Sequence, residues 1–243
     1  MQDNLRIVLV QTSHPGNIGA TARAMKNMNL QRLVLVAPRV FPSEEAEARA
    51  AGAGDVLEQA VVVETLAQAV ADCRTVIGAS ARLRSVSWPQ LDPRQSAQLA
   101  HAEAAQAPVA MVFGRESAGL SNDELDLCTH LMHIPTNPAF SSLNVAMAVQ
   151  VMAYELMMAG GETADAEPVR TGVAMASNAQ MEGFFAHLGQ ALDDIGFIDA
   201  GRSQKLMRRL RRLFHRAAPD EDEVNILRGI LSAAQGRKSM RRE

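Results

Sequence analysis

Three separated segments of the chain place small and polar residues directly after short apolar runs. They are Asn17–Arg23 (NIGATAR), Phe113–Leu120 (FGRESAGL), and Ile134-Pro135 together with Ser141–Ala148 (SSLNVAMA). Glycine and serine let a ligand approach the backbone, while arginine and glutamate add charge and hydrogen-bonding groups. In open α/β sheets, ligands bind in the crevice at the carboxyl ends of the strands. The three segments together therefore predict one ligand site at such an edge.

The first segment also has a simpler structural interpretation. Gly16 and Gly19 could form an ordinary turn from a strand into a helix, with Arg23 on the surface of that helix. A nicotinamide site fits poorly, because these glycines do not follow the G-x-G-x-x-G spacing and no acid is placed for a ribose. Arg39 could still meet a 2′-phosphate, so that alternative stays open.

The second and third segments could likewise be structural. Arg115 and Glu116 could form a loop ion pair ahead of a helix cap at residues 121–122. Ser141–Ser142 could cap the apolar helix that follows, with Asn144 in its first turn. Hydroxyl and amide groups at the positive end of a helix are also suited to a ligand, so the two interpretations are compatible.

Two more arginines, Arg82 and Arg84, follow the apolar run Val76–Ala79 and would lie at the same sheet edge. They could bind a phosphate backbone or form a solvated basic loop. His130 and His133 would point to opposite faces of a strand, so they do not predict a metal pair. The sequence has no evident Ser/His/Asp set or carboxylate dyad, which disfavours covalent hydrolysis.

These residues need a scaffold, and the chain alternates short apolar runs with stretches of helical composition. Such alternation predicts an α/β fold with a mainly parallel sheet and helices on both faces. The predicted strands are Leu5–Val10, Leu33–Val36, Val61–Val63, Val76–Ala79, Val109–Phe113 and Leu131–Ile134, and the predicted helices are Asn17–Leu30, Ser43–Ala51, Pro93–His101 and Leu143–Ala159.

The last of these helices closes a first domain of residues 1–160. Its Met, Ala and Leu residues lie on nearly every face, which indicates packing in the core or in a subunit interface. Residues 161–172 have linker composition, with small polar residues and no apolar periodicity. Residues 173–243 then predict a small helical domain, with helices at about 178–193, 202–215 and 221–234 and a disordered tail.

The middle helix of this C-terminal domain is strongly basic and contains no acid. Residues 170–243 hold 13 basic and 9 acidic side chains, although the whole chain has a formal charge of −3. Such a run is either a solvated face or a phosphate-binding surface, and its density favours RNA. Without interleaved aromatic residues, the helix would position RNA rather than read its bases. Its basic residues are Arg202, Lys205, Arg208, Arg209, Arg211, Arg212 and Arg216.

Composition excludes several other classes of protein. With 243 residues, 47% of them hydrophobic, the chain can bury a sizeable core. Cys73 and Cys128 are the only cysteines, which predicts neither a disulfide framework nor a zinc site. The N-terminus lacks signal-peptide features, and no apolar run reaches the roughly 18 residues that span a bilayer. We expect a cytoplasmic protein without a membrane partner.

The three segments, in this order and spacing, resemble the three motifs of the SPOUT (trefoil-knot) RNA methyltransferases. The resemblance covers about residues 5–159, and with the helical extension it is closest to bacterial tRNA 2′-O-methyltransferases that act on nucleotide 32 of the anticodon loop. It implies a trefoil knot at the carboxyl edge of the sheet, S-adenosylmethionine as methyl donor, tRNA as substrate and no metal. It also implies a homodimer whose site takes residues from both subunits.

The resemblance also assigns roles to individual residues. Arg23, Ser142 and Glu116 would be catalytic, and Asn17 and Asn144 would brace the loops. The methyl donor would lie against Ala79, Ser80, Ala81, Gly114, Ile134, Ser141, Ser142 and Leu143, and the RNA would face Arg82, Arg84, Arg115 and the basic helix.

The expected reaction is an in-line displacement in which a ribose 2′-hydroxyl attacks a sulfonium methyl group. Because a guanidinium stays protonated, Arg23 would hold the adjacent phosphate and lower the pKa of the hydroxyl, while Ser142 or the phosphate accepts the proton. Two alternatives remain, a methyltransferase of ribosomal RNA and a catalytically silent RNA-binding protein with the same fold.

Overall fold

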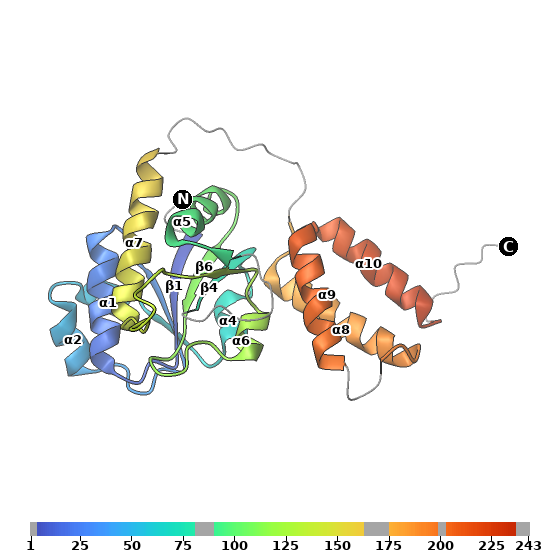
Figure 1. Ribbon diagram of the computed structural model, residues 1–243, viewed down its shortest axis with the longest axis horizontal. Coiled ribbons are helices and arrows are strands. Elements are labelled where there is room, and N and C mark those ends of the chain that lie inside the picture. Colours follow the sequence, from blue (N-terminus) through green and yellow to red (C-terminus); the bar gives the residue numbers. More distant parts are fainter. Residues whose placement is uncertain (1–3, 81–89, 163–174, 199–202, 237–243) are drawn as a thin grey trace. The chain divides into compact units, whose positions relative to one another are not determined.

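The computed structural model describes residues 4–80, 90–162, 175–198 and 203–236. The chain divides into two compact units, residues 1–168 and 169–243 (Figure 1). The first unit is an α/β sheet domain and the second is helical, as the sequence predicts. No described helix is long and apolar enough to cross a membrane.

The first unit is built on a seven-stranded sheet in the order β3-β2-β1-β6-β4-β7-β5. Every strand pair in it is parallel, which confirms the predicted sheet type. The carboxyl ends of all seven strands therefore meet along one edge. The strands are β1 (Leu5–Val10), β2 (Arg32–Val36), β3 (Val61–Val63), β4 (Thr75–Ala79), β5 (Gln90–Leu91), β6 (Val109–Phe113) and β7 (His130–Met132).

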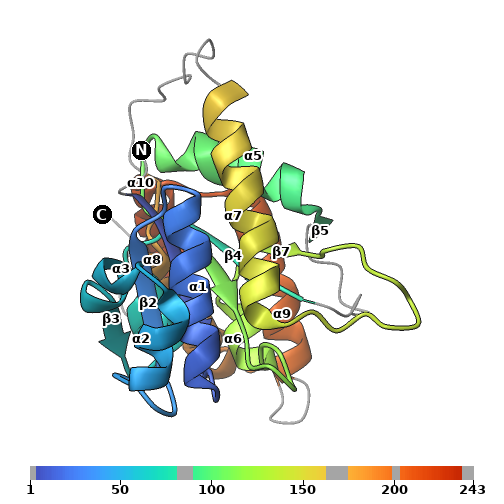
Figure 2. The same ribbon diagram turned by 90° about the vertical axis from the view of Figure 1, so that its left-hand side faces the viewer.

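Helices cover both faces of this sheet. Along β1, Ile7 and Leu9 join the apolar cluster beneath α1, α2, α5 and α7, while Val8 and Val10 join the cluster beneath α4 and α6. Figure 2 shows α1 and α7 side by side over the first face. The helices of this unit are α1 (Pro15–Asn27), α2 (Glu44–Ala50), α3 (Gly54–Glu58), α4 (Leu66–Val70), α5 (Pro93–Ala104), α6 (Asn122–Asp126) and α7 (Val145–Glu162).

The close packing of α1 on α2 depends on Gly19. A Cβ at this position would lie 2.0 Å from the backbone oxygen of Ala46 in α2, so only glycine fits. Gly16 and Gly19 thus lie inside α1 rather than in the turn considered from the sequence, and Gly19 serves helix packing. Pro15 occupies the first turn of α1, where the absence of its N–H costs no hydrogen bond.

The structure differs from the predicted elements mainly at short segments. β5, α3, α4 and α6 were not predicted, because elements of two to five residues are too short to show a periodic pattern. β7 ends at Met132, two residues earlier than predicted, and α7 continues to Glu162. The predicted linker lies mostly outside the described residues, as do Ala81, Arg82, Arg84, Arg202 and the predicted disordered tail.

The second unit consists of α8 (Asn178–Asp194), α9 (Ser203–Ala217) and α10 (Glu221–Ala234). Its core contains Phe184 and Phe185, both almost fully buried. Phe214 of α9 meets Phe184 edge to face, with ring centroids 4.7 Å apart. Aromatic packing therefore holds α9 against α8.

Candidate active site

The second and third segments line one cavity of about 320 Å³ at the carboxyl ends of β4, β6 and β7, whereas the first segment contributes no lining residue. This volume lies at the lower end of the roughly 300–1,000 Å³ common for small-molecule sites. Apart from Ala81, all residues predicted to contact the methyl donor line it. The lining residues are Ala79, Ser80, Phe113, Gly114, Arg115, Glu116, Ser117, Ala118, Gly119, Met132, Ile134, Thr136, Ser141, Ser142, Leu143, Val145 and Ala148.

One wall of the cavity is a tight turn over residues 115–119. The Gly119 N–H donates to the Arg115 carbonyl at 2.9 Å, and the Arg115 N–H donates to the Gly119 carbonyl at 3.2 Å. The turn folds back onto Gly114 so closely that a Cβ there would lie 2.2 Å from the Gly119 carbonyl carbon. Gly119 has a φ of 67°, a conformation that glycine adopts without strain.

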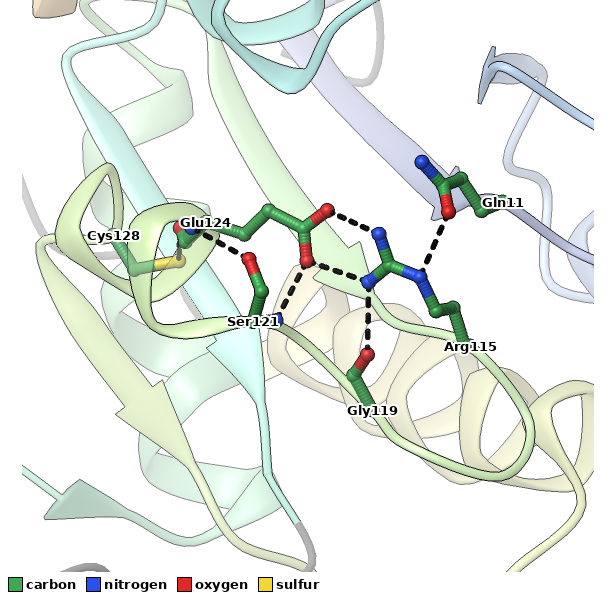
Figure 3. Close-up of polar contacts among 6 residues, drawn as sticks. All are labelled: Gln11, Arg115, Gly119, Ser121, Glu124 and Cys128. Carbon is green, nitrogen blue, oxygen red and sulfur yellow. Dashed lines mark hydrogen bonds and ion pairs between the residues drawn. The ribbon is translucent and has the colours of Figure 1, made fainter.

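The Arg115 side chain also holds this turn, because its Nη1 donates to the Gly119 carbonyl at 3.3 Å (Figure 3). Its Nη1 and Nη2 donate to the Glu124 carboxylate at 2.8 and 2.9 Å, and its Nε donates to Gln11 Oε1 at 2.9 Å. The Glu124 carboxylate raises the pKa of Arg115. The Ser121 cap of α6, which the sequence left open, is confirmed, but Arg115 pairs with Glu124 rather than with the neighbouring Glu116. Contact of Arg115 with RNA stays a prediction.

Glu116 connects the second segment to the loop after β1. Its carboxylate accepts hydrogen bonds from the Ser13 N–H and hydroxyl, the His14 N–H and Asn17 Nδ2, at 3.0–3.3 Å. Burial raises the pKa of Glu116, but the bonds from Asn17 and from backbone N–H groups outweigh it and lower the pKa to about 2. A carboxylate occupied by protein donors suits a positioning residue better than the catalytic role we expected.

Asn17 and Asn144 complete this link between the three segments. Asn17 donates to Glu116 at 3.0 Å, and its Oδ1 accepts from Asn144 Nδ2 at 2.9 Å. Asn144 Oδ1 in turn accepts from the Ala146 N–H at 2.9 Å, which caps α7. The predicted cap at Ser141–Ser142 is therefore wrong, because Asn144 makes the capping bond. Ser141 and Ser142 line the cavity instead.

Arg23 is not brought to this cavity by its own chain. Its side chain is exposed and it is absent from the lining residues. Asn17, which reaches the site, lies six residues earlier in α1, a rotation of about 120° around the helix. No hydrogen bond or ion pair joins the Arg23 side chain to another described residue. The guanidinium therefore does not line the cavity of the same chain.

The histidines near the site serve separate contacts. His133 Nδ1 lies 3.1 Å from the Ser80 carbonyl oxygen, and His130 Nδ1 lies 2.9 Å from the Thr129 hydroxyl. Burial lowers the pKa of His130. Among the described residues, no group of three or more His, Cys, Asp or Glu side chains could hold a metal ion.

Sequence reasoning missed Thr136, Ser117 and Ala118 of the lining. Thr136 Oγ1 donates to the Ser141 carbonyl at 3.3 Å and so closes the loop between β7 and α7. Its position directly after Ile134-Pro135 could have indicated it, because that pair marks the strand end.

The basic helix α9 presents only part of its predicted surface. Lys205, Arg209 and Arg216 are exposed. Arg211 instead forms an ion pair with Glu182, with Nη2 2.8 Å from Oε2, and its guanidinium lies 4.5 Å from the centroid of the Phe185 ring. Arg211 therefore has a structural role in the second unit, and its contact with RNA stays a prediction.

This parallel α/β domain, with two motifs lining one cavity at the strand ends and the third hydrogen-bonded to them through Asn17, has the features of a SPOUT-type methyltransferase. The chain belongs to the SpoU rRNA Methylase family, whose model matches residues 4–154. Residues 179–243 match the model of the tRNA methyltransferase TrmJ C-terminal domain. The resemblance seen in the sequence is thereby confirmed.

A curated relative and a solved structure, both TrmJ proteins, are similar to this chain over nearly its whole length. The tRNA (cytidine/uridine/adenosine-2′-O-)-methyltransferase TrmJ of Pseudomonas aeruginosa is 50% identical over 245 residues, covering 97% of this chain and 95% of the relative. The crystal structure of TrmJ from Z. mobilis ZM4 has a TM-score of 0.81 at 38% identity, covering 94% of this chain and 97% of that chain.

A more distant structure shares the fold alone. The SpoU methyltransferase AviRb of Streptomyces viridochromogenes, solved in complex with the cofactor AdoMet, has a TM-score of 0.52 at 20% identity. The match covers 67% of this chain and 60% of that chain.

Proposed function

We propose that this protein transfers a methyl group from S-adenosylmethionine to the ribose 2′-hydroxyl of nucleotide 32, a cytidine or uridine, in the anticodon loop of tRNA in the cytoplasm. The observation that carries the proposal is that the second and third motif segments line one cavity at the strand ends, and that Asn17 of the first segment is hydrogen-bonded to both of them. The second unit adds exposed basic residues on α9, which suit the phosphates of an RNA substrate.

The cavity fits a ligand with a flat base and a small polar tail. Its lining combines small side chains such as Ala79, Gly114 and Ser141 with the apolar residues Ile134 and Leu143. We expect main-chain N–H and C=O groups of the lining loops to read the adenine edge, because small side chains leave room for it. When bound, S-adenosylmethionine supplies an electrophilic methyl group on its sulfonium.

The protein's own residues then align the acceptor. Ser142 lies on the exposed stretch 137–144 at the cavity mouth, where it can accept a hydrogen bond from the 2′-hydroxyl. Arg23 holds the adjacent phosphate and stabilises the developing oxyanion by its positive charge. The link from Glu116 through Asn17 to Asn144 fixes the three loops relative to one another. Alignment of this kind supplies much of the rate acceleration in a displacement.

The position of Arg23 supports a homodimeric site. Because Arg23 does not line the cavity of its own chain, it acts on the cavity of a second subunit in our proposal. The neighbouring helix α7 carries an exposed apolar stripe with i, i+4, i+7 and i+11 spacing, which suits a symmetric contact between two copies. This stripe consists of Met147, Val151, Tyr154 and Met158.

Subunit complementation tests this arrangement. We expect Arg23→Ala and Ser142→Ala to be inactive separately. After the two variants are mixed and reassembled, a shared site restores about a quarter of the activity, because half of the dimers are mixed and each contains one complete site. If Arg23 acted within its own chain, the mixture would stay inactive.

The substrate class is tested with separated RNA pools. Unmodified tRNA and ribosomal RNA are incubated with the protein and S-adenosylmethionine labelled in the methyl group. Label in tRNA alone is the expected result. Label in ribosomal RNA would favour the ribosomal alternative, and no label in either pool would indicate a silent RNA-binding protein.

A further inference from the structure

Phe140 is the most exposed large apolar side chain of the described residues, with 80% of its surface accessible. It lies in the loop between β7 and α7, within the exposed stretch 137–144. The proposed catalytic Ser142 follows two residues later, so the two Cα atoms are at most ~7 Å apart. An aromatic ring thus stands in solvent on the same loop as Ser142, which lines the cavity.

The backbone around Phe140 is fixed by local hydrogen bonds. The Phe140 N–H donates to the Asn137 carbonyl at 2.9 Å, and the Ala139 N–H donates to Asn137 Oδ1 at 2.9 Å. The Thr136 hydroxyl closes the loop onto the Ser141 carbonyl. The ring is therefore presented from a defined turn, which reduces the entropy lost when a partner binds.

The surroundings of Phe140 favour a nucleobase as its partner. Exposed neighbours within the stretch are largely polar, including Asn137, Ser141 and Ser142. An apolar protein contact would need a contiguous patch, whereas a base combines a flat π face with a hydrogen-bonding edge. The one phenylalanine of the basic helix α9, Phe214, packs against the core of the second unit and is not presented to a base.

We infer that Phe140 stacks on the base of the nucleotide whose ribose is methylated, and so places its 2′-hydroxyl beside Ser142. This inference rests on the proposed tRNA methyltransferase function. Stacking is tolerant of base identity, because every base has a π face. It would hold the target nucleotide in place without selecting cytidine over uridine.

The test compares Phe140→Ala, Phe140→Leu and Phe140→Tyr in the full-length protein. The probe is a full-length tRNA with the fluorescent base pyrrolocytosine at position 32. For the Ala and Leu variants we expect tRNA affinity to fall about 5- to 150-fold, the range given by the stacking of one base. The fluorescence change on binding should disappear in these two variants and persist in Phe140→Tyr. Calorimetric binding of S-adenosylmethionine should be unchanged in all three.

A matched control is Val62→Ala, which truncates a side chain that is 52% exposed on β3, the outer strand at the other side of the sheet. This variant should bind tRNA like the unsubstituted protein. If Phe140→Leu bound tRNA with wild-type affinity, or if Phe140→Ala dissociated into monomers in sedimentation, the stacking role would be wrong. Either result would leave the proposed function standing. Absence of tRNA binding by the unsubstituted protein would overturn the proposed function and this inference with it.

Discussion

Substitution of Gly114 by alanine tests whether the turn at 115–119 forms the cavity wall. The added Cβ would lie 2.2 Å from the Gly119 carbonyl carbon, 2.4 Å from the Leu120 nitrogen and 2.5 Å from the Gly119 oxygen. These three atoms belong to the backbone, so no side-chain rotation relieves the overlap. The turn must move away from β6 by about 1 Å to restore ordinary contact distances.

The energetic consequence has two parts. Overpacking of this kind costs about 1–3 kcal/mol in well-packed regions. Movement of the turn also strains the two backbone hydrogen bonds between Arg115 and Gly119, each with a net contribution of about 0.5–1.5 kcal/mol. We therefore expect Gly114→Ala to lower the free energy of unfolding by roughly 2–6 kcal/mol, or to keep the fold with a displaced turn.

The assay measures stability and donor affinity in the same preparation. Urea unfolding gives the stability, and calorimetry gives the affinity for S-adenosylmethionine, which should fall at least about tenfold when a wall of the site is displaced by 1 Å. Gly161→Ala is the control, because a Cβ there has nothing within 4 Å and alanine favours the helix. Wild-type stability together with wild-type affinity in Gly114→Ala would refute the reasoning.

Two further predictions concern charged residues. Because the pKa of Glu116 is lowered from 4.5 to about 2, its carboxylate stabilises the fold above pH 4.5, and this contribution is lost as the pH falls towards 2. In Glu116→Gln, acid unfolding should depend less on pH in this window; an unchanged profile would contradict the role of the carboxylate. Arg211→Ala should lower the thermal midpoint of the second unit by removing the contacts with Glu182 and Phe185, whereas the exposed Arg209→Ala should leave it unchanged. Arg209→Ala should instead reduce the salt dependence of tRNA binding by about one unit of slope, and equal midpoints for the two variants would argue against a structural role for Arg211.

The α/β domain was predictable from sequence because its central strands are buried on both sides. β1 and β6 have the predicted bounds, since continuous apolar runs mark strands covered by helices on both faces. β3 also has its predicted bounds, although Val61 and Val62 are exposed at the outer side of the sheet. β5 contains only two residues and gave no signal. The chain order of the strands does not reveal their order in the sheet, and the knot was expected from the resemblance alone.

The site was predictable to the extent that its residues follow strand ends. Gly114 is the first residue after β6 and Ile134 the second after β7, so the parallel sheet brings them together. The partners of charged side chains were less predictable, because they depend on tertiary distances. Sequence reasoning could not decide that Arg115 pairs with Glu124, or that Arg211 is used inside the second unit. It also assigned the cap of α7 to serines, although Asn144 makes that bond.

The central claim is tested most directly by mapping the methylated nucleotide. Full-length tRNA transcripts with cytidine, uridine or adenosine at position 32 are incubated with the protein and S-adenosylmethionine, then digested and sequenced by mass spectrometry. We predict a single 2′-O-methyl group at nucleotide 32 of the cytidine and uridine transcripts. The adenosine transcript shows whether this protein also methylates adenosine, which the name of the Pseudomonas aeruginosa relative includes. A methyl group at another nucleotide, or on a base, would contradict the proposal.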